Sequence, residues 1–378
     1  MSDTSGTEQD LALKLRMMRF FWHLGYDVRK NVGVQELWYD QKTRYTDIDV
    51  LGFKIDEELS PHFVVCDCKS GATNETRQRL FWLSGVMKYF GVQRAYFVRT
   101  KMMSSRYMEL ADSLGILPIS EDQIAILEKA YSVRTVVFGP FCKEHAVADK
   151  VLRQLKKAPR VYDYVQTGYW EEPPQKQIIS LVSCCNAINE ITSITNKELD
   201  FLLSYMLSAL TLSILRFAQK ALVVPPIEQN DFIRLALLGG KIEFEEKKVL
   251  LGSFYGFMTR EIETRYRAKY PVSSTQFRDS LVPEFAKYLV DLVTRICQKP
   301  RNYLAAPRML SLLAFESILN DRDTPEEFVK LGYSSMDLPE AVFATKDFIV
   351  FATRSGLISS DTAKVFDEKI SKIGLKKR

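Results

Sequence analysis

The sequence has 378 residues, of which 46% are apolar, and a formal net charge of +5. This length allows two or three domains with sizeable cores. A charge this small permits nucleic-acid binding without indicating it, because many mildly basic proteins bind none. The six cysteines include no Cys-x-x-Cys pair and accompany only three histidines, which excludes the usual zinc spacings and a disulfide framework.

Cysteine usage and the first residues bear on the expected compartment. The first ten residues are polar and acidic, without the charged and then apolar layout of a signal peptide. Together with reduced thiols, this favours a cytoplasmic protein. The longest uncharged helical run, residues 201–215, is shorter than the roughly 20 residues that cross a membrane. We therefore expect a buried core helix there and no membrane partner.

Helices and strands alternate through residues 1–132. The predicted strands are rich in β-branched and aromatic residues and cover residues 26–37, 45–53, 63–69, 95–99 and 116–119. The predicted helices cover residues 11–24, 76–90, 104–114 and 121–131. A bulge or turn is expected around Asn31 and Gly33 in the first strand. The third strand is apolar on both faces, which predicts a central strand covered by helices on both sides.

Beyond residue 132 the pattern changes. Residues 133–174 are predicted to connect two domains, with a possible strand at 133–137 and aromatic residues clustered before Pro173. The predicted helices lie between proline and glycine breaks and cover residues 145–157, 175–192, 196–222, 228–239, 242–268, 274–298, 302–321, 325–331, 338–355 and 360–373. Their irregular spacing excludes a repeat of fixed period. We expect an α/β domain over residues 1–132 and a larger all-α domain over residues 175–378.

Two neighbouring predicted strands carry acids where strand interiors are normally apolar. Side chains alternate along a strand, so Asp47 and Asp49 share one face, and Asp67 and Lys69 share a face of theirs. A buried carboxylate needs a cation or hydrogen bonds, and oxygen ligands on rigid strands suit Mg²⁺. The sequence therefore predicts a divalent-metal site where the two strands meet. Asp47 could point into the same pocket as Asp49 or lie at the exposed start of its strand.

An Asp closing one strand and Asp-x-Lys closing the next resemble the motif of the PD-(D/E)XK nuclease superfamily. This superfamily includes type II restriction enzymes, Holliday junction resolvases and many repair and defence nucleases. The proline of the family name is absent, since residues 46–48 stand in its place. The resemblance implies a restriction endonuclease-like αβββαβ core, with a mixed sheet flanked by helices. It also implies that Asp49 is the first acid, Asp67 the second and Lys69 the catalytic lysine.

The same resemblance implies a chemistry and a setting. Mg²⁺ or Mn²⁺ would be held by Asp49, Asp67 and the main-chain carbonyl of Cys68, while Lys69 would orient the attacking water or neutralise charge on phosphorus. The expected substrate is duplex or branched DNA, with RNA as an open alternative. Anti-phage defence or restriction is the expected role. The helical domain would serve targeting or assembly, through a protein partner or self-association.

The helices beside these strands offer further candidates. Superfamily members often carry a Glu on the first helix, but here the only acids, Glu8 and Asp10, stand well upstream of its middle. We therefore expect no first-helix acid at the site. On the later helix Gln78, four residues before Trp82, resembles a glutamine of some exonuclease branches. It could equally belong to a solvated polar helix start.

Two other interpretations remain open. Asp67 and Lys69 could form a surface ion pair, with Asp49 solvated in a neighbouring turn. The domain could also be a degenerate nuclease fold that binds nucleic acid or acts as a scaffold subunit in a larger complex. The three histidines have no carboxylate or cysteine at ligand spacing, so they are expected to be ordinary surface or core residues.

Overall fold

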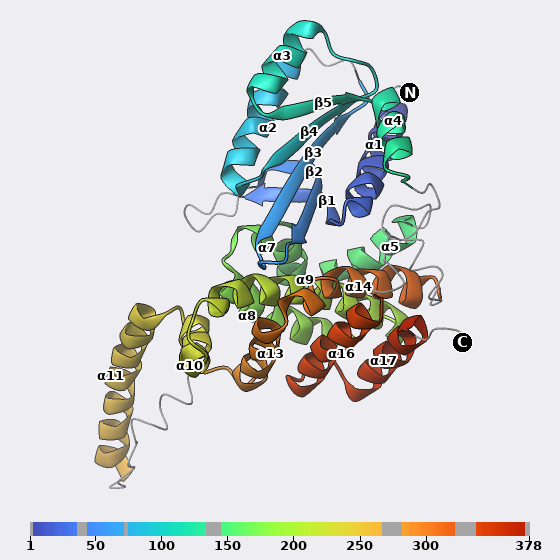
Figure 1. Ribbon diagram of the computed structural model, residues 1–378. Coiled ribbons are helices and arrows are strands. Elements are labelled where there is room, and N and C mark those ends of the chain that lie inside the picture. The colour runs from blue at the N-terminus through green and yellow to red at the C-terminus, as the bar shows by residue number, and fades with distance from the viewer. Residues whose placement is uncertain are drawn as a thin grey trace.

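The computed structural model describes residues 3–35, 44–71, 75–133, 145–266, 282–321 and 338–374. A five-stranded mixed sheet with flanking helices is followed by a mostly helical region, and the two pack against each other (Figure 1). This confirms the predicted order of an α/β region and a larger helical region.

The sheet runs in sequence order. Its strands are β1 (Asp27–Gln35), β2 (Arg44–Ile55), β3 (Pro61–Lys69), β4 (Arg94–Arg99) and β5 (Ile116–Ser120). Neighbours are antiparallel from β1 to β3 and parallel from β3 to β5. Strand β3 is therefore central, as its apolar residues on both faces predicted. The expected irregularity in β1 is present, because Asn31 has a φ of 53° and the register shifts between Val34 and Gln35.

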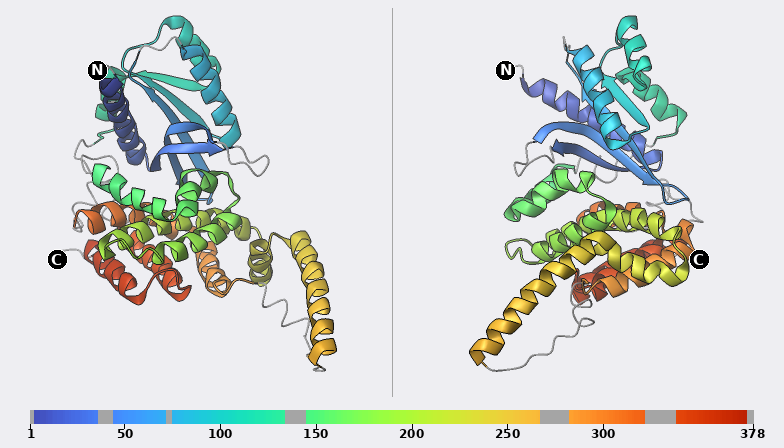
Figure 2. Two further views of the ribbon diagram at one scale, coloured as in Figure 1. Left: turned by 180° about the vertical axis from the view of Figure 1, so that it is seen from behind. Right: turned by 90° about the vertical axis from the view of Figure 1, so that its left-hand side faces the viewer.

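Helices cover both faces of this sheet (Figure 2). They are α1 (Asp3–His23), α2 (Thr76–Phe90), α3 (Ser105–Ser113) and α4 (Glu121–Ala130). On one face, buried Phe21 of α1 shares a core with Cys66 of β3. On the other, Leu83 of α2 and Phe97 of β4 form a second, smaller core. Buried apolar side chains on both faces explain why the strands are nearly continuous apolar runs, interrupted only where acids occur.

The second region is built of α5 (His145–Leu152), η2 (Arg153–Lys157), α6 (Pro159–Asp163), η3 (Tyr164–Gly168), α7 (Tyr169–Glu171), α8 (Pro174–Asn189), α9 (Asn196–Leu222), α10 (Pro226–Leu237), α11 (Lys241–Tyr266), α13 (Ala286–Gln298), η4 (Pro300–Tyr303), α14 (Ala306–Leu312), η5 (Leu313–Leu319), α16 (Leu338–Arg354) and α17 (Ser360–Gly374). Segments η2 and η4 are 3₁₀ helices, whereas η3 and η5 are π-helical.

The structure corrects several predicted boundaries. Of the helix predicted over residues 274–298, residues 286–298 form α13, residues 282–285 are not helical, and residues 274–281 lie outside the described residues. Short helices over residues 159–171 were not predicted, because proline and glycine interrupt their apolar pattern. Of the strand predicted at 133–137, only Val133 is described, and it is not in a strand. The helix predicted at 325–331 lies outside the described residues.

Helix α9 is the centre of the helical region and packs against α8, α13 and α14. Its length and composition would allow it to cross a membrane, yet 94% of its most apolar 18-residue stretch is buried in the protein. This matches the core helix expected at residues 201–215. A capping box between Thr195 and Glu198 fixes its start. Hydroxyl groups inside it bond to carbonyl oxygens, such as Ser204 to Leu310 at 3.0 Å, so they are satisfied without water.

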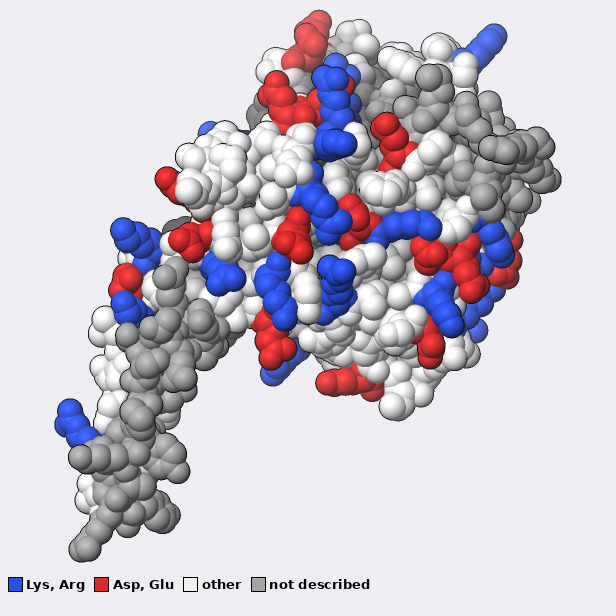
Figure 3. Space-filling model, turned by 60° about the horizontal axis from the view of Figure 1, so that its bottom comes forward, with Lys and Arg blue, Asp and Glu red and all other residues white. Residues whose placement is uncertain are grey.

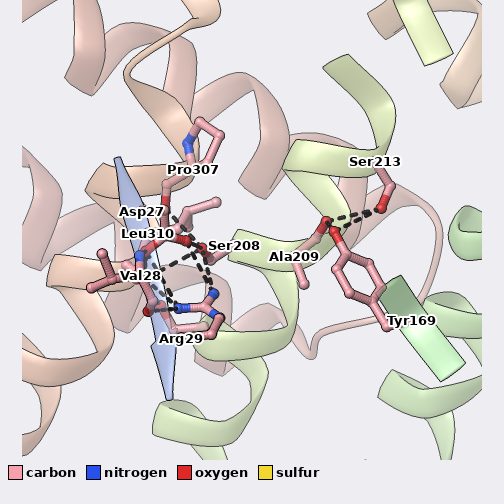
Figure 4. A network of polar contacts seen from close by, with 11 residues as sticks. Asp27, Val28, Arg29, Tyr169, Ser208, Ala209, Ser213, Pro307 and Leu310 are labelled. Carbon is pink, nitrogen blue, oxygen red and sulfur yellow. Dashed lines mark hydrogen bonds and ion pairs between the residues drawn. The ribbon is translucent and has the colours of Figure 1, made fainter. Parts of the chain in front are cut away.

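A buried polar network joins the two regions (Figure 4). Arg29 of β1 lies 3.1 Å from Asp27, and its guanidinium stacks over the ring of Tyr205 at 4.5 Å. Ser208 of α9 and Ser311 of α14 complete its hydrogen bonds at 3.4 Å. Burial raises the pKa of Asp27, and the nearby Arg29 opposes that rise. The sheet is thus tied to the helical region by a closed set of charged and hydroxyl groups.

Candidate active site

The sheet forks between β2 and β3, and the predicted acids stand at the fork. These strands pair as far as Val50 and Cys66, after which β2 stays with β1 alone and β3 continues beside β4 to Lys69. Continuing the register by one residue places Asp49 opposite Asp67. Asp49 is 5% exposed and Asp67 is fully buried. The structure therefore brings the two predicted acids together at the point where the strands separate.

Asp49 is held from three sides. Its Oδ2 accepts a hydrogen bond from the main-chain N–H of Cys68 at 2.8 Å. Its Oδ1 lies 2.7 Å from Nζ of Lys14, on α1, and Nζ of Lys69 lies 3.9 Å from Oδ2. Lys14 also donates to Oδ1 of Asn31 at 2.9 Å. These donors compensate for the burial of the carboxylate.

Asp67 pairs with a different cation. Both of its oxygens accept hydrogen bonds from Arg79 of α2, with Nε of Arg79 at 3.0 Å from Oδ2. The guanidinium also lies over the ring of Trp82, 4.8 Å from its centre. Burial raises the pKa of Asp67 to about 6, although Arg79 lowers it, and the neighbouring Asp49 adds to the rise. The pKa of Asp67 is therefore closer to neutral pH than that of a solvent-exposed aspartate.

The surface ion-pair interpretation is wrong. It required a solvated Asp49 and a pair between Asp67 and Lys69, whereas Asp49 is buried in β2 and Asp67 pairs with Arg79. Lys69 lies beside Asp49, with its Nζ 3.9 Å from Oδ2 of Asp49, whereas that interpretation paired Lys69 with Asp67. Asp47, which could have faced the same pocket, is exposed and lines a cavity shared with the helical region.

The first helix contributes more than the sequence indicated. Helix α1 begins at Asp3, so Asp10 lies well inside it, and its Oδ1 accepts the N–H of Ser70 at 2.6 Å. An acid of the first helix thus reaches the main chain directly after Lys69, whereas the sequence had placed the acids of this helix upstream. Asp10 and Lys14 are four residues apart and so share one helix face. That spacing is the signal that could have identified both residues.

Gln78 and Arg79 stand side by side on α2, and they face different ways. Gln78 is exposed, while Arg79 reaches Asp67. Successive helical residues are about 100° apart, so only one of the two can face the sheet. Arg99, at the end of β4, donates to Thr76 at 2.7 Å and to the carbonyl of Gly71, which anchors the start of α2. This anchor fixes the position from which Arg79 extends.

The oxygen atoms at the fork are of the type that binds divalent metals. The N–H and C=O of one residue in a strand point to the same side, so the carbonyl of Cys68 faces the gap that holds Asp49. With Asp67, this gives three hard oxygens of the type that Mg²⁺ prefers. The described residues contain no cluster of three or more acidic, histidine or cysteine side chains suited to a metal. A metal here would take the carbonyl and water as its other ligands.

Cations form the rim of the site, above the acids. The side chains of Lys14, Lys69 and Arg79 are 16%, 28% and 26% exposed, whereas those of Asp49 and Asp67 are 7% and 0% exposed. Three positive charges thus stand between two negative charges and solvent. An incoming anion meets the cations first, which suits a phosphate group.

No protein-family model matches this chain, and no match exists among the curated proteins or the solved structures compared with it. The chemistry of the fork is therefore inferred from its own residues: two buried carboxylates on adjacent strands, one carbonyl beside them, and three cations at the rim.

Proposed function

We propose that this protein is a metal-dependent nuclease that hydrolyses phosphodiester bonds in DNA at the fork between β2 and β3. One observation carries the proposal: the fork brings Asp49 and Asp67 together beneath a cationic rim that includes Lys69. Those residues are also the ones that carry the resemblance to the PD-(D/E)XK superfamily. A metal site with a lysine beside it is suited to attack on phosphorus by water.

The residues at the fork divide the work. Asp49, Asp67 and the carbonyl of Cys68 would hold Mg²⁺ or Mn²⁺, whose chemistry there is to polarise the scissile phosphate and to make an attacking water more acidic. Lys69, which is the more exposed neighbour of Asp49, neutralises charge that develops on the phosphate oxygens.

Arg79 has a double role in this proposal. Its guanidinium holds both oxygens of Asp67. If Asp67 were bound to a divalent metal instead, the guanidinium, which is 26% exposed, would be available for two parallel hydrogen bonds with a phosphate. Arg79 lies in the first turn of α2, where the helix dipole also favours an anion.

A second function is favoured by a specific observation. Both carboxylates are already neutralised by Lys14, Lys69 and Arg79, and no third acidic side chain of the described chain completes a metal cluster with them. Such an arrangement can bind a phosphate backbone without cleaving it. The alternative is therefore a nucleic-acid-binding or scaffold subunit of a larger complex, whose binding is insensitive to chelators.

The helical region is proposed to serve targeting or assembly. On the face shown in Figure 3, acidic and basic side chains are interspersed and form no large field of one sign, so that face is not suited to hold a DNA backbone. Helix α11 extends away from the body (Figures 1 and 2) and exposes apolar side chains, including Val249, Leu250 and Phe257. Exposed apolar surface of this kind supports a protein partner or self-association. Antiviral defence remains part of the proposal by family resemblance, and a cytoplasmic setting by the cysteine usage and the polar first residues.

Cleavage assays test the proposal. Purified protein is incubated with Mg²⁺ or Mn²⁺ and with duplex DNA, branched DNA, single-stranded DNA or RNA. Cleavage of at least one substrate is expected, and it is expected to disappear in Asp49→Asn and Lys69→Ala. Exposed Asp112 and Lys101 lie outside the fork, so Asp112→Asn and Lys101→Ala serve as matched controls that retain activity.

The outcome also separates the two functions. Absence of cleavage with every substrate and both metals contradicts the nuclease proposal. Chelator-insensitive gel shifts of duplex or branched DNA would then support the binding module, and loss of those shifts in Lys69→Ala would place the binding at the fork.

A further inference from the structure

A cavity of about 530 Å³ lies where β1 and β2 meet the helical region. Its walls come from both regions and include Lys30 of β1, Arg153 of η2 and Phe315 of η5. Ligand pockets in proteins are commonly about 300 to 1,000 Å³ and often lie between domains. The size and position of this cavity are therefore those of a small-molecule site.

Two π-helical segments line this one cavity. Gln166 comes from η3 and Phe315 from η5, the two π-helical segments of the described chain. A π-helical turn is rare, is less favourable than an α-helical one, and is frequently retained at functional sites.

Several polar groups on the walls are free to bind a ligand. Within the described part of the chain, the amide of Gln166 and the hydroxyl of Tyr162 make no hydrogen bond. Arg153 is exposed, and its guanidinium contacts only the main-chain carbonyl of Asp149, at 3.2 Å, among the residues that the structure describes. Lys30 pairs with the side chain of Asp149 at 2.6 Å, at the same wall.

We propose that this interdomain cavity binds a nucleotide. Arg153 supplies a cation for a phosphate group, on the same wall as Lys30, which is paired with Asp149. The ring of Tyr162 lines the cavity, with Nζ of Lys156 5.5 Å from the ring centre, and is an aromatic group there that a base can contact. The amide of Gln166 has a donor and an acceptor, which is the pattern that reads the edge of a base. Phosphate, aromatic base and base edge thus each find a group of matching chemistry.

The cavity adjoins the fork through a short chain of hydrogen bonds. Asn31 lines the cavity and accepts a hydrogen bond from Lys14, which pairs with Asp49. Asn31 has a φ of 53°, a left-handed conformation that is uncommon outside glycine. Because the cavity adjoins the fork, the bound nucleotide can be either a free molecule or one unit of a nucleic-acid strand that extends to the fork. Only the second source rests on the proposed nuclease function.

Isothermal titration calorimetry of the full chain tests this site. The probes are the four ribonucleoside monophosphates, their triphosphates, inorganic phosphate and a short oligothymidylate. At least one nucleotide is expected to bind with a stoichiometry of one, and more tightly than inorganic phosphate. Arg153→Ala and Tyr162→Ala should each weaken binding by about tenfold. Arg160→Ala, an exposed arginine of α6 outside the cavity, should change it by less than about twofold.

Two further titrations complete the test. Competition between the oligothymidylate and a mononucleotide assigns the cavity to a strand, and absence of competition assigns it to a free nucleotide. Lys69→Ala should bind the nucleotide as the wild type does, so loss of the nuclease proposal leaves this result intact. The inference is overturned if no nucleotide or oligonucleotide binds at about 1 mM, or if Arg153→Ala and Arg160→Ala weaken binding equally while both variants melt as the wild type does.

Discussion

In the described part of the chain, two aspartate–arginine pairs with a buried carboxylate differ in how far the partner arginine is exposed. Asp27 and Arg29 are 2% and 8% exposed, and Ser208, Ser311 and the ring of Tyr205 complete the surroundings of the guanidinium. At the fork Asp67 is equally buried, but its partner Arg79 reaches in from a helix surface with a side chain that is 26% exposed.

This comparison shows what separates a structural pair from an exchangeable one. In the first pair both carboxylate oxygens and both terminal nitrogens of the guanidinium are hydrogen-bonded or ion-paired, so neither partner can leave without stranding a buried charge. The second pair stands beside another carboxylate, Asp49, and its cation has a path to solvent. The same two residue types therefore hold two regions together in one place and lie at the proposed metal site in the other.

Removal of Arg29 should have the largest effect. Arg29→Ala leaves Asp27 buried without its cation, so the free energy of unfolding should fall by about 3–5 kcal/mol. Urea unfolding followed by circular dichroism measures it. The double variant Asp27→Leu/Arg29→Met removes both charges and should recover most of the loss. A loss below about 1 kcal/mol in Arg29→Ala would show that the network does not tie the regions together.

Removal of the Lys69 side chain should slow the cleavage reaction without destabilising the fold. Lys69→Ala is expected to lower the cleavage rate by about 10²–10³-fold, the usual cost of one charge-stabilising group at a reacting centre. Its midpoint in urea should stay close to that of the wild type, because the lysine side chain is partly exposed. Single-turnover cleavage kinetics measure the rate. A fully active Lys69→Ala variant would remove the lysine from the proposed mechanism.

Removal of Arg79 should have an intermediate effect that a metal reverses. Arg79→Ala leaves Asp67 without its partner and should lower the free energy of unfolding by about 1–3 kcal/mol in chelator. Mg²⁺ should stabilise this variant more than the wild type, since no guanidinium competes for Asp67. Thermal melts with and without Mg²⁺ give the comparison, and Arg77→Ala, at an exposed position of the same helix, is the control. If Mg²⁺ shifts the melting temperatures of Arg79→Ala and Arg77→Ala equally, the proposed replacement of Arg79 by the metal at Asp67 is contradicted.

The raised pKa of Asp67 gives opposite pH trends for stability and activity. Its pKa is about 6 in the folded protein, against an ordinary value near 3.8. The folded state therefore binds the proton more tightly, so the contribution of Asp67 to stability falls as pH rises from about 4 to about 6. Metal binding needs the ionised carboxylate, so cleavage should fall about tenfold per pH unit below pH 6. A cleavage profile that stays flat down to pH 5 would contradict this assignment.

Much of the fork could be predicted because it depends on local patterns. Alternation along two strands was enough to bring Asp49, Asp67 and Lys69 to one region, and apolar residues on both faces placed β3 at the centre. Arg79 could not be chosen over Gln78, because the choice depends on how α2 is rotated against the sheet. Asp10 was discounted because the helix was expected to start after it.

The interdomain network was beyond sequence reasoning for another reason. Asp27 and Arg29 are near one another in the chain, but Ser208 and Ser311 are far from them and mark no motif. Their role arises only from the packing of α9 and α14 against β1. The short helices over residues 159–171, which carry Gln166 into the cavity, were hidden by proline and glycine in the same way.

A crystal soaked in Mn²⁺ tests the central claim most directly. The account predicts anomalous density between Asp49 and Asp67, with carboxylate oxygens about 2.1–2.2 Å from the ion, and a guanidinium of Arg79 that has left Asp67. In a matched crystal of Asp49→Asn the density should be absent or much weaker. Arg79 still bound to Asp67 at saturating Mn²⁺, with no density at the fork, would contradict the account.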